Sequence, residues 1–281
     1  MKKINKKKKK KIIKKNTSLH SNKSKGNKER KKWWKKIVSF LIVCGCVGIF
    51  AVFAFCIYIV ASCGKFDPNA LANQDQTIIY DKDNNVIGKL GMEKRESVTY
   101  DKLPQVLIDA IVATEDSRFF QHNGVDGARF LKASVGQVLG NSSAGGASTL
   151  TMQVVKNNLT STERNGIEGI IRKFKDVYIS VFFMEKKYTK EEIMEFYVND
   201  SLLGGNVYGV EEASKYYFGK SVSQLSLPEA AIIAGLFQSP NGDNPYKNPE
   251  RTKKRMNTVL KLMVRHGYIT QKEADIAAKI D

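Results

Sequence analysis

An uncharged, strongly apolar stretch near the N-terminus constrains this chain more than any other feature. Residues 37–61, IVSFLIVCGCVGIFAVFAFCIYIVA, are 25 positions without Asp, Glu, Lys or Arg. A helix of this length would span roughly 37 Å, enough to cross the hydrocarbon core of a bilayer with some tilt. Trp33 and Trp34 lie where an aromatic belt at the membrane surface is expected. The sequence therefore predicts a single transmembrane helix over residues 37–62.

The positive charge of the chain is concentrated in front of that segment. The formal net charge is +18, and residues 1–36 hold 18 Lys and Arg against one acid, so this tail alone carries 18 − 1 = +17. With almost no apolar residues, it is predicted to be a disordered basic tail. The positive-inside rule places the tail in the cytoplasm and everything after Ser62 outside the cell. A basic tail beside a membrane anchor suits anionic lipid headgroups and argues against nucleic acid as a partner.

Two other interpretations of the apolar segment stay open. It could be a cleaved signal peptide, although 25 residues is long for the apolar part of one. The tetrapeptide VASC, which ends at Cys63, resembles a lipoprotein processing site, so lipidation of Cys63 is an alternative. The other three cysteines lie inside the apolar segment, so no disulfide framework is expected in the part that follows.

The remainder of the chain is predicted to be a linker with a hairpin and then a mainly α-helical domain. Residues 63–94 contain two β-prone runs around an Asp-Asn-Asn turn, which predicts a small hairpin at the beginning of the domain. Over residues 95–281 the apolar spacing is that of helices, and Ser/Thr-x-x-Glu capping boxes begin two of them, at Thr189 and Ser226. There are no internal repeats.

The stretch ATEDSRFFQHNGVD is the first that carries side chains suited to catalysis. Glu115 ends an apolar helix, where partial desolvation would suit its carboxylate to proton transfer near neutral pH. Phe119 and Phe120 would form the apolar wall beside it. Taken alone, the stretch is better explained as a solvated helix end with Arg118 as the partner of the acid.

Two later stretches carry further polar groups. GGASTLTMQVVKN offers glycines for close backbone approach and hydroxyls and amides for sugars or phosphates, or else it is a flexible loop that caps a helix at Ser148 or Thr149. In RKFKDVYISVFFMEKK, Arg172 and Asp176 are i,i+4 neighbours on a helix, and a weak surface ion pair is the alternative interpretation.

Five stretches together resemble the peptidoglycan glycosyltransferases of glycosyltransferase family 51. That family includes the monofunctional transglycosylases and the N-terminal domains of class A penicillin-binding proteins. The stretches similar to its first to fifth motifs are EDSRFFQHNG, GASTLTMQ, RKFKD, KEEIMEFYVN and RMNTVL, in family order over roughly residues 95–270. The resemblance implies a lysozyme-like, mainly α-helical glycosyltransferase domain with a membrane-embedded lobe, in which Tyr197 and Asn199 of the fourth motif would hold the fold.

The activity that the resemblance implies is the polymerisation of lipid II into peptidoglycan glycan strands outside the cell. The glycan attached to the lipid diphosphate would be transferred with inversion to an acceptor sugar hydroxyl, and undecaprenyl diphosphate would leave. The expected partners are lipid II, the growing glycan strand, membrane lipids and other cell-wall synthesis proteins. A divalent cation, Mg or Mn, is expected to bind with the substrate diphosphate, whereas the sequence shows no metal-binding cluster of its own.

The resemblance also implies roles for individual residues. Glu115 would be the general base that deprotonates the acceptor hydroxyl, and Asp176, the acid of the third motif, is the second catalytic candidate. A diphosphate leaving group requires cationic side chains around it as its charge develops. The substrate-binding candidates are Asp116, His122, Lys132, Ser148, Thr149, Gln153, Lys156, Arg164, Arg172 and Lys173.

Three positions depart from the family pattern. The third motif usually ends in glutamate where this chain has Asp176. The second often has Gln-Gln where this chain has Met152-Gln153, and the fifth usually has two arginines where it has Arg255-Met256. We interpret these departures as tolerated variation.

Rival functions stay open at this point. A lysozyme-like glycan hydrolase would use Glu115 as a general acid, although it would not need the phosphate-suited cations. A catalytically weak scaffold of the cell-wall machinery is the other rival.

A transpeptidase would need a Ser-x-x-Lys motif. The only such spacing in the chain runs from Ser62 to Lys65 in the linker, so the chain as given is expected to be monofunctional, or a shortened bifunctional protein. The weakly charged segment Val125–Gly140 is a candidate for contact with the lipid interface, or a plain buried helix.

Overall fold

A computed structural model of the protein describes most of the chain. The residues described are 2–64, 67, 71, 77–83, 86–90, 94–138, 146, 148–160 and 166–280. They form two compact units, Met1–Ala61 and Ser62–Asp281. Each unit is considered by itself below.

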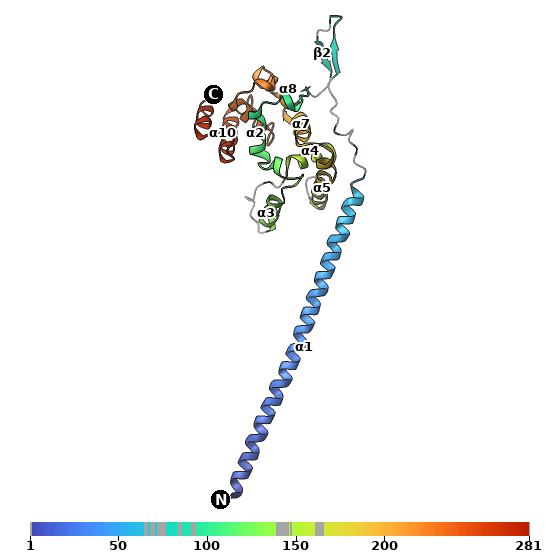
Figure 1. Cartoon of the computed structure of the whole chain (residues 1–281), viewed down its shortest axis with the longest axis vertical. Helices are drawn as coiled ribbons and strands as arrows, with labels where there is room; N and C mark the ends of the chain where they lie inside the picture. The colour runs from blue at the N-terminus through green and yellow to red at the C-terminus, as the bar shows by residue number, and fades with distance from the viewer. Residues whose placement is uncertain are drawn as a thin grey trace. The chain divides into compact units, whose positions relative to one another are not determined.

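The first unit is one continuous helix, α1 (Lys2–Ser62) (Figure 1). Its segment Lys32–Ser62 is long and apolar enough to cross a membrane, with a mean hydropathy of 2.9 over its most apolar 18-residue window. Large apolar side chains such as Phe40 and Ile49 are exposed along it, which is expected of a helix whose surroundings are lipid. The predicted N-terminal apolar helix is therefore confirmed.

The basic tail differs from its prediction. Residues 2–36 are part of helix α1 and not a disordered segment. Lysine is a good helix former, and a helix that already exists can propagate into neighbouring residues without the cost of a new nucleus. The prediction rested on the lack of apolar residues in the tail and overlooked the helix that adjoins it.

The second unit begins with the hairpin that the sequence predicts. Strand β1 (Thr77–Tyr80) pairs antiparallel with β2 (Val86–Leu90), with Thr77 opposite Leu90. A second small sheet was not predicted. In it, β5 (Val207–Tyr208) pairs parallel with β3 (Lys94–Arg95) and antiparallel with β4 (Leu202–Gly204). Strands of two and three residues are too short to show an alternating pattern in the sequence.

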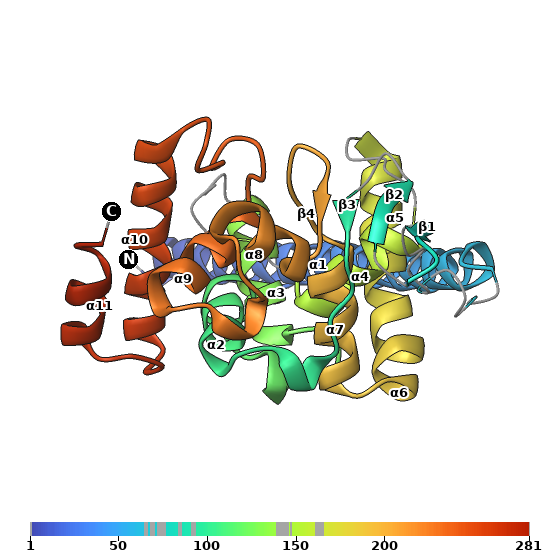
Figure 2. The same ribbon diagram turned by 90° about the horizontal axis from the view of Figure 1, so that it is seen from above.

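The rest of the second unit is mainly α-helical, as predicted. In Figure 2, α10 and α11 lie at one end of this unit and α5 and α6 at the other, with α2, α4 and α7 between them. The helices are α2 (Gln105–Glu115), α3 (Gly127–Val138), α4 (Leu150–Asn158), α5 (Gly166–Ile179), α6 (Glu185–Lys187), α7 (Lys190–Asp200), α8 (Val210–Phe218), α9 (Leu227–Leu236), α10 (Pro249–Arg265) and α11 (Gln271–Ala277). The shorter helical turns are η2 (Tyr100–Lys102), η3 (Phe119–Gln121), the π-helical η5 (Ser180–Met184) and η6 (Val222–Gln224).

Local signals in the sequence set the ends of several helices. Thr189 caps α7 by accepting a hydrogen bond from the Glu192 main-chain N–H, and the Glu192 carboxylate accepts one from the Thr189 main-chain N–H at 2.7 Å. The same capping box begins α9 at Ser226. Gly267, with a φ of 79°, follows the last turn of α10. The two capping boxes predicted at Thr189 and Ser226 are therefore confirmed.

The apolar core holds the two helix ends that form the candidate site. Helix α2 packs against α9 and α10 through side chains such as Leu107 and Ile111, which are completely buried. Burial of one such side chain stabilises the fold by roughly 1.5–3 kcal/mol. Helix α4 packs against α7, where the ring of Tyr197 stacks on Phe237 with centroids 4.7 Å apart. The end of α2 and the beginning of α4 are therefore fixed by the core.

Asn199 fastens the extended segment before α2 to α7. Its side-chain amide accepts a hydrogen bond from the Val98 main-chain N–H at 3.0 Å and donates one to the Val98 carbonyl at 2.9 Å. Asn199 is buried, so both of its polar atoms need such partners. The fold-holding role expected for this fourth-motif residue agrees with these contacts.

Candidate active site

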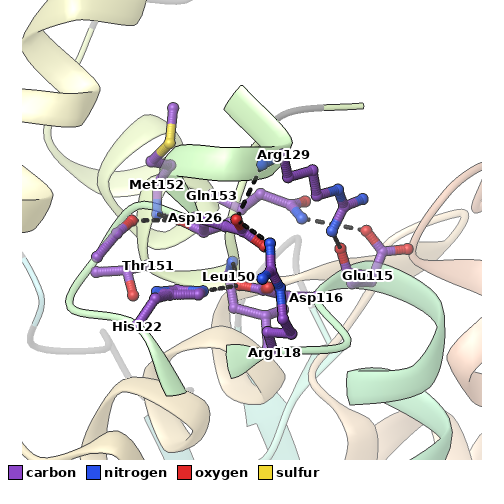
Figure 3. Close-up of polar contacts among 12 residues, drawn as sticks. Glu115, Asp116, Arg118, His122, Asp126, Arg129, Leu150, Thr151, Met152 and Gln153 are labelled. Atoms are coloured by element: carbon purple, nitrogen blue, oxygen red, sulfur yellow. Dashed lines mark hydrogen bonds and ion pairs between the residues drawn. The ribbon is translucent and has the colours of Figure 1, made fainter. Parts of the chain in front are cut away.

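Glu115 is the last residue of α2, and neighbouring residues hold both its side chain and its main chain. Gln153 of α4 donates a hydrogen bond from Nε2 to Glu115 Oε2 at 3.1 Å. Arg129 of α3 donates one from Nη1 to the main-chain oxygen of Glu115 at 3.0 Å (Figure 3). Glu115 is half-buried. It therefore combines a fixed carboxylate with access from outside, which proton transfer with a substrate requires.

Asp116 is completely buried and joins two elements. Its Oδ2 atom accepts a hydrogen bond from the Leu150 main-chain N–H at 3.1 Å and lies 2.9 Å from His122 Nε2. Because Leu150 is the first residue of α4, this carboxylate fixes the start of α4 against the end of α2. Asp116 and His122 are thus brought together as a buried tie, which favours a positioning role for both over direct contact with substrate.

Thr149 lies in a different environment from the one predicted for it. It is completely buried at the start of α4, and its Oγ1 accepts a hydrogen bond from the Met152 main-chain N–H at 3.2 Å. The same hydroxyl donates to the Gly124 carbonyl at 2.6 Å. Both interactions are with protein groups, so of the two interpretations of this stretch the structure supports the helix cap at Thr149. Ser148, the neighbouring candidate, is exposed.

Gly124, the glycine of the first motif, allows a close approach between two segments. Its φ is 82°, a conformation that favours glycine. A Cβ atom at this position would lie 3.0 Å from the main-chain carbon and oxygen of Ser180, in the π-helical turn that follows α5. Gly124 therefore brings the first-motif loop against the helix that carries the third motif.

Asp176 of α5 is buried and is not part of a surface ion pair. Thr160 donates a hydrogen bond from Oγ1 to Asp176 Oδ1 at 2.7 Å, and Arg172 Nη1 lies 3.3 Å from Asp176 Oδ2. Burial raises the pKa of Asp176, against the lowering effects of the Thr160 hydrogen bond and of the charges on Arg172, Lys156 and Lys173. The structure thus gathers three of the predicted phosphate-binding cations around one buried acid.

Helix α4 connects this cationic cluster to Glu115. Gln153 and Lys156 are three residues apart on α4, so they lie on neighbouring turns of the same side. Gln153 contacts Glu115, and the charge of Lys156 acts on Asp176. Gln153, which holds the general-base candidate, and Lys156, one of the cations, are therefore about 4.5 Å of rise apart on α4.

Other predicted residues are less closely tied to these groups. Lys132 is exposed on α3, and Arg164 lies outside the described residues. Phe119 is completely buried, and the Lys190 ammonium lies 4.5 Å from its ring centroid. Phe120, by contrast, is 48% exposed, so the two phenylalanines do not form a continuous buried wall.

The donor atoms in the described residues do not form a protein-only metal site. Among these residues, no group of three or more His, Cys, Asp or Glu side chains is placed to hold a metal ion. The oxygens of Asp176 are bonded to Thr160 and Arg172. The side chains gathered around them are cations, which suit phosphate oxygens and not a divalent cation.

Residues 83–264 match the protein-family model described as Transglycosylase. The chain belongs to the transglycosylase family. The predicted family and the predicted transglycosylase domain of the class A penicillin-binding protein type are therefore confirmed. The ordered motifs quoted from the sequence lie within the matched range.

Several relatives of this transglycosylase chain are penicillin-binding proteins. It is 37% identical to penicillin-binding protein 1A/1B of Bacillus subtilis (strain 168) over 241 residues, which cover 85% of this chain and 26% of the relative. It is 41% identical to penicillin-binding protein 1A of Escherichia coli (strain K12) over 197 residues, which cover 70% of this chain and 23% of the relative. The chain thus spans about a quarter of the length of these relatives. A crystal structure of penicillin-binding protein 1A from Haemophilus influenzae covers 74% of this chain and 21% of its own, at 29% identity and a TM-score of 0.43.

Sequence reasoning missed two residues of this transglycosylase site. Arg129 contacts Glu115 although it follows by 14 residues, and Thr160 contacts Asp176 from 16 residues away. Both contacts depend on how the helices pack, so no local pattern in the sequence predicts them. Asp126 did carry a signal, since an aspartate just before a helix is a typical cap, and it accepts a hydrogen bond from the Arg129 main-chain N–H at 3.0 Å.

Proposed function

We propose that this protein is a membrane-anchored peptidoglycan glycosyltransferase that polymerises lipid II into glycan strands. The observation that carries the proposal is the arrangement along α4. Gln153 binds the Glu115 carboxylate, and Lys156 lies beside the cluster of Asp176 and Arg172. A base next to a set of phosphate-suited cations is what a sugar transfer with a diphosphate leaving group needs.

In this mechanism, Glu115 accepts the proton of the acceptor sugar hydroxyl. The acceptor oxygen forms a bond to the anomeric carbon of the donor, and the bond from that carbon to the diphosphate oxygen breaks with inversion. The electron pair of the broken bond leaves with undecaprenyl diphosphate. Gln153 holds Glu115 in orientation for this step, because its amide fixes one carboxylate oxygen.

The cations around Asp176 stabilise the leaving group. The charges of Lys156, Arg172 and Lys173 all act on the Asp176 carboxylate, and we assign these three cations to the diphosphate. Asp176 itself is buried with both oxygens bonded, so its proposed role is to hold Arg172 and not to transfer a proton. Ser148, Lys132 and Arg164 are assigned to substrate by the family resemblance.

A divalent cation, Mg or Mn, is proposed to arrive with the substrate diphosphate. Its ligands would be phosphate oxygens and water, because the described residues form no cage for it. When bound, it would neutralise part of the diphosphate charge. No protein residue is assigned to it.

The proposed site of action is the outer surface of the cell membrane. Helix α1 would anchor the chain, with its basic end in the cytoplasm. Exposed apolar residues occur on α3 and α5, including Leu131, Ile167 and Ile170, which are 66%, 76% and 56% exposed. We assign them to the lipid interface, where the lipid-linked substrates and neighbouring proteins of cell-wall synthesis would be reached.

The test is polymer formation by the full chain in detergent with labelled lipid II and Mg or Mn. Glu115→Gln should abolish polymer while lipid II still binds, because the amide keeps the shape but cannot accept the proton. Lys272→Met, a change on the exposed face of α11, is the matched control. Cleavage of preformed glycan without polymer would establish the hydrolase instead, and no turnover by the wild type would establish a scaffold.

A further inference from the structure

Arg129 is a cation placed at the end of the helix that carries Glu115. Helix α2 has no basic residue in its last turn. The last carbonyls of a helix lack partners within the helix, and the dipole of the helix makes that end unfavourable for a carboxylate. The Val112 carbonyl accepts a hydrogen bond from the Asp116 main-chain N–H at 3.1 Å, and the Glu115 carbonyl accepts one from Arg129 Nη1 at 3.0 Å.

Contacts with Asp126, and through it with Arg118, hold Arg129 in place. Asp126, which is 5% exposed, accepts a hydrogen bond from the Arg129 main-chain N–H at 3.0 Å and so caps the first turn of α3. Asp126 also forms a two-point ion pair with Arg118, with Nε 2.8 Å from Oδ2. Figure 3 shows Arg118, Asp126 and Arg129 in line, with the Arg129 guanidinium against Glu115. The first turn of α3 is thus fixed to the segment that follows Glu115.

The charge of Arg129 also acts on the residue that follows α10. His266 follows the last residue of α10, and its pKa is lowered by burial and then by the charges of Arg265 and Arg129. The positive charge of Arg129 is favourable at the C-terminal end of α2, where its guanidinium donates to the Glu115 carbonyl.

We propose that Arg129 is a positioning residue that ties α3 to the main chain of Glu115 and so fixes the carboxylate for proton transfer. This inference rests on the proposed function, in which Glu115 is the base. It assigns to Arg129 a role distinct from that of the cations around Asp176, which would bind the leaving group. Arg129 also connects α3, on which Leu131 is exposed, to Glu115. A movement of α3 would therefore shift Glu115 through the Arg129 side chain.

The kinetic test compares Arg129→Met, Arg129→Lys and the wild type as full chains in detergent. Methionine keeps an unbranched apolar stem and loses the donors and the charge, so kcat should fall by about 10- to 100-fold with KM changed by less than about threefold. Lysine retains a donor and a charge and should recover a large part of the lost kcat. Arg251→Met is the matched control, because it removes an arginine that pairs with Asp243 at 2.6 Å on the first turn of α10. A rise in KM with kcat preserved, or an unchanged kcat, would overturn the proposal.

An activity-independent measurement separates this inference from the proposed function. Amide hydrogen exchange at residues 112–116 should be faster in Arg129→Met than in the wild type or in Arg251→Met, since the last carbonyl of α2 loses its hydrogen bond to α3. Unchanged exchange there would refute the tie even if polymer forms. Faster exchange in a protein that makes no polymer would leave the tie standing and remove the proposed function.

Discussion

Replacement of Asp176 by asparagine is expected to leave the protein almost as stable at pH 7. Burial raises the pKa of Asp176 although Thr160 and Arg172 act in the opposite direction. A raised pKa means that the fold disfavours the ionised carboxylate relative to the unfolded chain, by about 1.4 kcal/mol for each unit. Removing the charge relieves this cost, and the relief offsets the lost attraction to Arg172.

The contacts of Asp176 set the size of the expected effect. Arg172 Nη1 lies 3.3 Å from Oδ2, which is long for a charged hydrogen bond, whereas Thr160 Oγ1 lies 2.7 Å from Oδ1. Asparagine has the same shape, so its amide can keep its oxygen toward Arg172 and donate from its nitrogen to the Thr160 hydroxyl, which can accept as well as donate. The free energy of unfolding should change by about 1 kcal/mol or less, whereas cutting one partner out of a buried pair costs about 3–5 kcal/mol.

The direction of the pKa shift determines how the contribution of Asp176 to stability changes with pH. Because the folded pKa of Asp176 is raised, the folded state holds more protons than the unfolded state at pH values just above about 3.9. The stability that this group contributes is present below that pH and is lost as the pH rises through the folded pKa. Asp176→Asn should remove this slope from the stability curve.

Asp126 is a control because its pKa is shifted in the opposite direction from that of Asp176. Although burial opposes its ionisation, hydrogen bonds from the Arg129 main chain and from Arg118 hold the pKa of Asp126 below its ordinary value. Its contribution is therefore present above about pH 4 and is lost as the pH falls. Asp126→Asn should lower the free energy of unfolding at pH 7 by about 1–3 kcal/mol.

Urea unfolding of the full chain in detergent, followed by circular dichroism from about pH 2 to about pH 8, measures both variants and covers both pH windows. Asp176→Asn should match the wild type at pH 7, while Asp126→Asn should be less stable. A loss of more than about 3 kcal/mol in Asp176→Asn would show that attraction to the cations outweighs burial, and the reasoning would be refuted.

Three further predictions concern stability and use the same unfolding assay. Gly124→Ala should lose about 2–4 kcal/mol, from the φ of 82° and from a Cβ 3.0 Å from the Ser180 main chain, and wild-type stability would contradict this. Asn199→Ala should lose about 2–4 kcal/mol because both main-chain groups of Val98 lose a buried partner, and a loss under about 1 kcal/mol would count against that tie. Tyr197→Phe should be neutral or slightly stabilising, because the hydroxyl is buried without a hydrogen-bond partner among the described residues; a loss above about 1 kcal/mol would reveal a partner.

The parts of the fold that could be predicted are those set by residues close together in the sequence. The β1–β2 hairpin follows from its turn, and α7 begins at Thr189 because the partner of that cap lies three residues away. The strands β3 and β5 could not be predicted, because they are two residues each and pair across more than a hundred positions. The tail failed for a related reason, since its helix depends on the segment that follows it.

The candidate site divides in the same way. Motif residues such as Glu115 and Asp176 were identified because their types and order match a family. Their partners Arg129 and Thr160 were not, because helix packing brings them into contact. For Thr149 the sequence left a helix cap and a substrate ligand open, and the structure was needed to show that its hydroxyl is buried and bonded to protein groups.

The departure at Asp176 is best understood from the bonds that this shorter acid makes. Its two oxygens reach Thr160 and Arg172, and the residue is 3% exposed, so no partner is left out of reach by the missing methylene. A longer acid at this position would have to displace one of them or shift α5 against α4, at a cost of about 1–3 kcal/mol. Asp176→Glu should therefore lower stability and should not raise kcat, if the acid acts by holding Arg172. A gain in kcat on restoring the family's usual glutamate would show instead that the carboxylate itself must reach the substrate.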